Sequence, residues 1–410
     1  MILRWCLAFL LISFEIQAEG NFPSCSIRGF GTLSMSGTDT DRLGFRRDTT
    51  QANGIRRSPG IDNDSRLGLQ LDVDFTDFWH AGLQWVARDH AGDFFEQNLE
   101  WAYLRWRPSN DIDIRIGRLG FNVFMLSDYR NVGYAYLWAR PPHEFYGNLI
   151  PYHFDGADLT WTFPTAAGQL TLKGYGGHSF MQLPIQNVKT LDLQLALAGA
   201  TMVYEQGDWQ FRLGYAYSQT LDAELDQYFP SLLASPALNA VWPGARSLLK
   251  EFSLTRQKVH FGSIGLSYDD GVWVAQTEAM YLGSNLKIYP DTASAYLSLG
   301  RRIGGVTPYI LLSIAETPVD HVAIPELPQS QSALVGFRNQ IDNVVNNNGI
   351  DQKSVSLGLR WDLYENIALK AQWSHFWLGQ NGTQLWIEPR DFGPTPREVN
   401  TWTLGFDFLF

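Results

Sequence analysis

The stretch Val399–Phe410 reads VNTWTLGFDFLF, and its pattern decides which fold the whole sequence specifies. Large apolar side chains occupy every second position, at Trp402, Leu404, Phe406, Phe408 and Phe410. The positions between them are mostly small or polar and hold Thr401, Thr403, Gly405, Asp407 and Leu409. Because successive side chains of a strand point to opposite faces, this alternation predicts a strand with one apolar and one mostly polar face.

The same alternation recurs along the chain and predicts 16 strands. In Arg66–Phe75, for example, Leu67 and Leu69 share one face while Gln70 and Asp72 share the other. The connections are alternately short turns and long loops, as in bacterial outer-membrane barrels with an even number of strands. We therefore expect an all-β protein, a transmembrane antiparallel β-barrel. A soluble jelly roll or sandwich is the alternative, and it predicts fewer Trp and Tyr residues at strand ends.

The N-terminus and the composition limit where the protein resides and what it binds. Met1–Ala18 contains Arg4 and the apolar stretch Trp5–Ile12, which predicts a secretory signal peptide and leaves residues 19–410 as a single barrel domain. Cys25 is then the one remaining cysteine, so no internal disulfide can form. No later run of 18 apolar residues occurs, which excludes a helical membrane protein. The net charge of -11 argues against nucleic acid as a partner.

The polar faces of the predicted strands indicate a hydrated interior. They carry many charged or amide side chains, among them Arg66, Gln70, Asp72, Arg115, Asp158, Lys173, Arg212, Glu278, Arg360 and Lys370. A barrel of 16 strands is too wide for side chains to fill and encloses an aqueous channel. The architecture therefore implies a pore.

The closing strand resembles that of Gram-negative outer-membrane barrels, and the whole mature chain resembles the 16-stranded porins. The loop Leu119–His153 matches, in position and length, the third long loop of porins, which folds into the lumen and narrows the channel. The resemblance implies a constriction formed by Asp128, Arg130, Arg140 and Glu144 on this loop, Arg118 at its root, and Arg28, Arg66 and Arg115 on the wall. It also implies a homotrimer in the bacterial cell outer membrane, in contact with lipid and lipopolysaccharide.

The chain also departs from the general porins. Their PEFGG-type motif is absent, and Pro142–Phe145 is only distantly similar to it, so the resemblance does not extend to the acidic side of the constriction. Loop arginines could then favour anionic solutes. Alternatively, the charged loop residues pair with one another and only fix the loop. An arginine-rich earlier loop, with Arg46, Arg47, Arg56 and Arg57, either binds lipopolysaccharide phosphates or an anionic solute, or is simply solvated.

These features predict a passive, water-filled diffusion channel for small hydrophilic solutes. The alternative is a substrate-specific porin for small anionic nutrients such as organic acids or phosphate-like solutes. We expect no enzyme, metal or cofactor, because the sequence has no nucleophile elbow, metal-spaced histidine pair or phosphate-binding glycine loop. The chain is too short for a plugged 22-stranded transporter. The long segment Glu316–Lys353 reads as a polar surface cap.

Overall fold

The computed structural model describes residues 15–16, 23–148, 151–185, 188–223, 225–285, 289–318, 321–346, 349–379, 383–387 and 395–410. The predicted signal peptide Met1–Ala18 therefore falls almost wholly outside the described residues. Its two described residues form β1 (Glu15–Ile16), which pairs with Ser26 and Cys25. Cleavage after Ala18 stays a prediction.

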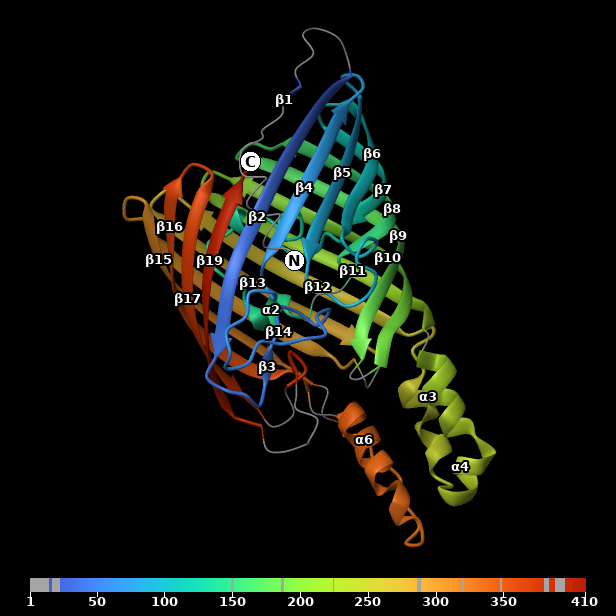
Figure 1. The fold of residues 1–410 in the computed structure, drawn as a ribbon. Helices are drawn as coiled ribbons and strands as arrows, with labels where there is room; N and C mark the ends of the chain where they lie inside the picture. Colours follow the sequence, from blue (N-terminus) through green and yellow to red (C-terminus); the bar gives the residue numbers. More distant parts are fainter. Residues whose placement is uncertain are drawn as a thin grey trace.

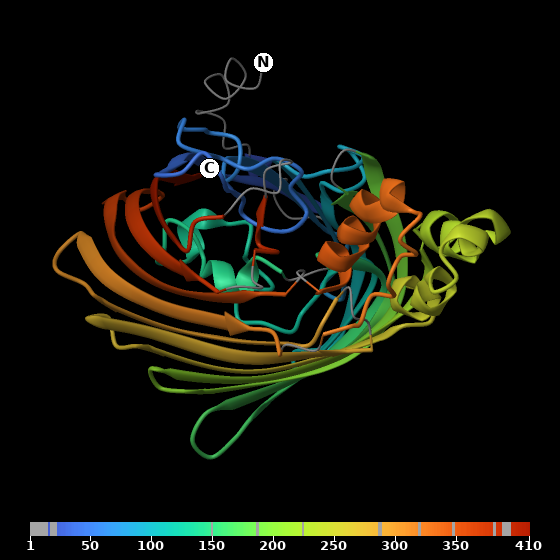
Figure 2. The same ribbon diagram turned by 90° about the horizontal axis from the view of Figure 1, so that it is seen from below.

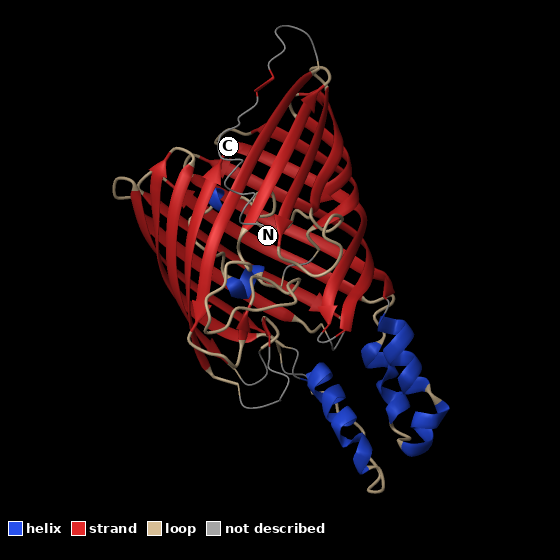
Figure 3. Ribbon diagram, viewed as in Figure 1, coloured by secondary structure: helices blue, strands red, loops and turns tan. Residues whose placement is uncertain are grey.

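Sixteen long antiparallel strands in the described part of the chain close into a barrel (Figures 1 and 3). In chain order they are β2 (Ser24–Thr38), β4 (Arg66–Asp74), β5 (Trp79–Arg88), β6 (Leu99–Ser109), β7 (Ile112–Gly120), β8 (His153–Pro164), β9 (Gln169–Ile185), β10 (Val188–Gln206), β11 (Trp209–Ala223), β12 (Lys258–Asp269), β13 (Trp273–Ser284), β14 (Thr292–Arg301), β15 (Val306–Glu316), β16 (Asp351–Tyr364), β17 (Ile367–Leu378) and β19 (Glu398–Leu409). Each pairs with its neighbour in sequence, and β19 closes the ring against β2. The predicted 16-stranded barrel is confirmed.

The connections alternate between short and long, as expected, with one exception. Strands β9 and β10 are joined within residues 185–188, at the end of the barrel that otherwise carries the long loops. They are also the longest strands, with 17 and 19 residues, so this hairpin takes the place of a loop. Two short strands, β3 (Gly44–Phe45) and β18 (Trp386–Ile387), pair with each other and join the first long loop to the last one.

The outer face of the barrel is apolar. Its exposed side chains include Ile116, Leu159, Trp161, Leu297, Leu357 and Leu404 on strands spread around the ring. A sheet that spans a bilayer must close on itself to satisfy its backbone and must present apolar side chains to lipid. The closed ring with this outer face is therefore the architecture of a bacterial outer-membrane barrel.

At the closing seam, glycines of β2 lie beneath aromatic rings of β19. A Cβ atom at Gly29, Gly31 or Gly37 would overlap the ring of Phe410, Phe408 or Trp402 respectively. The rings of Phe406, Phe408 and Phe410 also contact one another in sequence along the strand. The apolar face that the sequence showed on the last strand thus needs a glycine face on the first one.

Two of the long loops contain helices that the sequence analysis did not predict. One carries α3 (Leu225–Ala234), α4 (Pro236–Val241), η2 (Ala245–Leu248) and α5 (Leu249–Phe252), and the other carries η3 (Ser332–Leu334) and α6 (Val335–Asn346). They project from the end of the barrel opposite the C-terminus (Figure 1). Leu233, Trp242 and Phe252 share an apolar core with Ile341 and Val345. The second loop is therefore half of a packed helical module rather than a polar cap.

None of the described helices is long and apolar enough to cross a membrane.

Replacing Gly29 and Gly31 by Val should displace the two terminal rings and weaken the seam. Overpacking of this kind costs about 1–3 kcal/mol of unfolding free energy, measurable by urea unfolding in detergent micelles. Gly262→Val is the matched control, because a Cβ atom there would meet nothing within 4 Å. Equal stability of the double variant and the control would contradict the role assigned to the seam.

Candidate functional site

Residues 121–148 and 151–152, which we call the lumen loop, lie between β7 and β8 in the chain and inside the ring of strands (Figure 2). The loop contains two short helical turns, η1 (Gly133–Ala135) and α2 (His143–Tyr146). Its apolar side chains pack on the inner wall: Phe121 contacts Phe261, and Phe145 contacts Tyr296 with ring centroids 5.2 Å apart. The prediction that the third long loop folds into the lumen is confirmed.

Basic side chains of the wall hold the lumen loop through its backbone. Lys370 on β17 donates to the carbonyl oxygens of Gly133 (2.6 Å), Tyr136 (2.6 Å) and Trp138 (3.1 Å). Its ammonium group also lies 3.0 Å from the carboxylate of Asp407, and both side chains are almost completely buried. The opposite section of the loop meets β11 and β12, where Ser263 donates to the carbonyl oxygen of Val123 (2.9 Å). The loop therefore crosses the lumen and is fixed at both sides.

The predicted constriction residues Arg66 and Arg140 come together, but they are buried. Arg140 forms an ion pair with Asp64, and its guanidinium lies 3.9 Å from the centre of the Phe45 ring. Arg66 donates to the carbonyl oxygens of Asn131 (2.6 Å) and Asp64 (2.9 Å). These two arginines join the lumen loop to the wall and to the first long loop.

Glu144, the predicted acidic residue of the constriction, points into the wall. It is 1% exposed, accepts a hydrogen bond from Gln352 (2.8 Å) and another from Ser313. No described basic side chain forms an ion pair with it. Its neighbour His143 contributes no charge either, because burial and the nearby Arg140 hold the pKa of His143 well below its ordinary value. Glu144 thus anchors α2 rather than facing solute.

The predicted residues Arg28 and Arg115, together with Asp128 on the lumen loop, face the part of the lumen nearer the short turns. Arg28 pairs with Asp72 at 3.3 Å, and its side chain is 69% exposed although it points inward. Arg115 forms an ion pair with Asp158 and lies over the Tyr103 ring.

Asp128 is exposed on the lumen loop. Desolvation by the protein around the lumen would by itself raise its pKa, but the charges of Lys173, Arg212 and Arg115 hold the pKa of Asp128 below its ordinary value. Water therefore reaches this side of the loop, and a charged carboxylate stands there.

Arg118 lies on the outer face of the barrel. It shares that face with Ile116, and Gly117 with φ +133° separates the two residues. Its guanidinium pairs with Asp155 through two contacts of 2.8 Å. The structure thus places Arg118 away from the other predicted constriction residues.

Arg130 belongs to a charged cluster that the sequence analysis only partly identified. The ring of Tyr152 lies between the guanidinium groups of Arg130 (3.7 Å from the ring centre) and Arg88 (4.1 Å). Glu100 contacts both arginines, at 3.8 and 3.3 Å. The hydroxyl of Tyr152 donates to Asp48 of the first long loop (2.5 Å). Arg88 and Glu100 lie in strands without any motif, so only the fold could reveal them.

The first long loop, residues 39–65, completes the cluster and is not a solvated basic loop. Arg46 donates to the carbonyl oxygens of Gln51 (3.2 Å) and Leu385 (3.2 Å). Arg47 donates to the carbonyl oxygen of Arg130 (3.0 Å) and forms no ion pair with a described carboxylate. Of the remaining arginines of this loop, Arg57 is exposed and lies 3.3 Å from Asp41, whereas Arg42 and Arg56 are half-buried.

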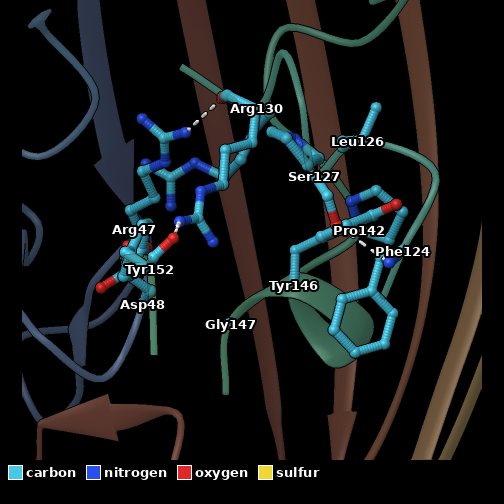
Figure 4. A pocket seen from close by; sticks show the side chains of 12 residues that line it. Arg47, Asp48, Phe124, Leu126, Ser127, Arg130, Pro142, Tyr146, Gly147 and Tyr152 are labelled. Atoms are coloured by element: carbon cyan, nitrogen blue, oxygen red, sulfur yellow. Dashed lines mark hydrogen bonds between the residues drawn. The ribbon is translucent and has the colours of Figure 1, made fainter. Parts of the chain in front are cut away.

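A cavity of about 30 Å³ lies where the first loop meets the lumen loop (Figure 4). Arg47, Arg130 and Tyr152 approach it from one side. Phe124, Pro142 and Tyr146 face them from the other side, and Arg140 also contributes to the lining. The cavity therefore has one cationic and one apolar wall.

No group of three or more His, Cys, Asp or Glu side chains in the described residues could hold a metal ion.

Comparisons with known proteins support the architecture but give no sequence relative. No protein-family model matches the chain, and no curated protein matches it. Several solved structures share the fold. OmpF of Salmonella typhi, solved with daunomycin, has a TM-score of 0.54 and 12% identity, covering 97% of this chain and 100% of that one. The outer membrane channel DcaP of Acinetobacter baumannii has a TM-score of 0.53 and 11% identity, covering 98% and 100%.

A third similar structure is an anion-selective porin from Comamonas acidovorans, with a TM-score of 0.52 and 14% identity over 95% of this chain and 100% of that one. At these identities the similarity establishes the fold, which is the 16-stranded porin-like outer-membrane barrel. The matched proteins include a porin and a channel. The expectation of a 16-stranded porin-like barrel fold is thereby confirmed.

Lys370→Met should release the lumen loop. The change removes three hydrogen bonds to the loop and leaves Asp407 buried without its cation, which typically costs about 3–5 kcal/mol. We expect larger and noisier single-channel currents together with a lower free energy of unfolding. In the double variant with Asp407→Asn, stability should partly recover while the currents stay large. Unchanged currents in Lys370→Met would contradict the anchoring role.

Proposed function

We propose that this protein is a passive, water-filled channel for small hydrophilic solutes and that it favours anions. The inward-pointing, exposed side chain of Arg28 and the exposed carboxylate of Asp128 support the presence of water within the lumen. The bound lumen loop divides that lumen, so solutes would pass the charged groups on the loop and on the wall beside it.

The observation that carries the anion preference is the charge of the cluster between the first loop and the lumen loop. Among the described residues it gathers six guanidinium groups, those of Arg46, Arg47, Arg66, Arg88, Arg130 and Arg140. The carboxylates beside them number five, from Asp48, Asp64, Asp89, Glu100 and Asp407, and Asp407 also pairs with the ammonium group of Lys370. Fixed charges of one sign in a narrow passage attract counter-ions and set selectivity. The surplus is positive although the whole chain is acidic.

The general-porin alternative, a channel with weak cation preference, would need an acidic group opposite the arginines. Glu144 is the candidate from the sequence, and its hydrogen bonds to Ser313 and Gln352 on the wall argue against that role. Asp128 is exposed but stands among Lys173, Arg212 and Arg115. The positive surplus therefore has no acidic counterpart of equal size nearby.

The reversal potential in a potassium chloride gradient tests this proposal. Wild-type channels should show an anion-selective reversal potential. Arg47→Glu changes the charge of the cluster by two units, and the reversal potential should therefore shift toward cation selectivity. Arg47 suits the test because its guanidinium makes one hydrogen bond, to the backbone carbonyl oxygen of Arg130. Arg302→Glu, at a short turn far from the cluster, is the control with the same charge change. A cation-selective wild type would refute the proposal.

We also propose that the protein is a homotrimer embedded among lipid and lipopolysaccharide, exported by the signal peptide Met1–Ala18. An open crevice on the outer face supports an interface, since it is lined by Phe95, Leu99 and Ile116 and by the ion pair of Arg118 with Asp155. Such a pair is better accommodated against protein than against hydrocarbon. Native mass spectrometry should detect three copies, and a wild-type monomer would exclude the trimer.

A further inference from the structure

We propose that the cavity between the first loop and the lumen loop is a binding site for a small carboxylate of about acetate size. The site rests on the proposed anion channel, since its ligand would enter from the same lumen. The proposal adds a saturable binding site, formed by Arg47, Arg130 and Arg140, to a channel that otherwise only attracts anions.

The first argument is that Arg140, which lines the cavity, has unused hydrogen-bonding capacity. The residue is 3% exposed and lines the cavity, yet its Nε and Nη1 atoms have no hydrogen-bond partner among the described residues. Only its Nη2 atom is engaged, by Asp64 and Ser36. Buried donors are rarely left without an acceptor, because an unmade bond costs free energy. A bound anion would supply the missing acceptor.

The second argument is the excess of positive charge at the cavity wall. Arg47, Arg130 and Arg140 line it, whereas Asp48 is the one carboxylate among the lining residues. Asp48 already accepts hydrogen bonds from the backbone N–H of Thr50 (3.0 Å), its hydroxyl (2.5 Å) and Tyr152 (2.5 Å). Burial also lowers the pKa of the Arg140 guanidinium despite its pairing with Asp64, which reflects a charge that lacks full compensation.

The shape and lining of the cavity indicate the class of anion. Its volume of about 30 Å³ holds roughly two water-sized groups. Opposite the arginines stand Phe124, Leu126 and Pro142, which offer no hydrogen-bond donor, and Tyr146, whose hydroxyl already donates to Glu278. A carboxylate presents two oxygens to a guanidinium fork and a carbon end to an apolar wall. Inorganic phosphate would leave polar oxygens against that apolar wall, so a small carboxylate fits better.

The test is block of chloride current by acetate at constant chloride in planar bilayers. Wild-type current should fall along a saturating curve, and Arg47→Gln should raise the half-blocking acetate concentration about tenfold or more. Arg47→Lys, which keeps the charge but loses the planar fork, should give an intermediate value. Arg28→Gln, also in the lumen but outside the cavity, should leave the value within twofold of wild type.

Two outcomes would overturn the inference. One is a current that changes linearly with acetate, or equally in wild type, Arg47→Gln and Arg28→Gln. The other is half-block by phosphate at a concentration tenfold lower than that of acetate, which would assign the site to inorganic oxyanions. The reversal potential in potassium chloride alone, recorded in the same bilayers, reports on the anion channel separately from the site. If a variant forms no channels, titration calorimetry of acetate into the detergent-solubilised protein supplies the affinity.

Discussion

The constraint on which this structure depends is that no backbone hydrogen-bonding group of a membrane-spanning sheet can be left unpaired. The pairing of β19 with β2 meets this constraint by closing the ring, and it requires glycines beneath the terminal aromatic rings. Closure at 16 strands in turn creates an interior too wide for side chains. The lumen loop fills part of this wide interior, because it is a chain segment whose own apolar residues are buried against the wall.

The lumen loop is held by charged side chains that are buried between the loop and the wall. Burial of these charges would cost free energy if they had no partners. Lys370 and Asp407 are buried together, and the loop carbonyl oxygens complete the coordination of the ammonium group. Arg66 and Arg140 serve the same purpose on the side of the first loop. The charged residues that the sequence predicted to line the constriction therefore fall into two sets. One set fastens the loop, and the other, which shares Arg66 and Arg140 with the first, carries the positive surplus.

Much of the fold could be predicted from the sequence because its signal is local. Strand alternation repeats every two residues, and turn residues mark the short connections, so the predicted strand Arg66–Phe75, for example, lies within one residue of β4. The helical module was missed because its apolar residues meet across two loops about 100 residues apart, as Trp242 and Phe337 do. No local pattern in either loop shows that the other one supplies its partner surface.

The site was less predictable, since its geometry depends on contacts between distant segments. Asp64 and Arg140 are 76 residues apart, and nothing near either residue indicates their pairing. Parity assigned Arg115 correctly to the inner face, and the same parity places Arg118 with Ile116 on the outer face, so its position at the root of the loop was a misleading guide. Glu144 was chosen because it is acidic and on the right loop, whereas its orientation is set by Ser313 and Gln352 on the wall.

The central claim is that the held lumen loop leaves a hydrated path whose positive surplus favours anions. Swelling of liposomes that contain the purified protein tests it most directly, using three solutes of equal size that are anionic, neutral and cationic. The account predicts the fastest entry for the anion, slower entry for the neutral solute and the slowest for the cation. Fastest entry of the cation, or no swelling with any of the three, would contradict it.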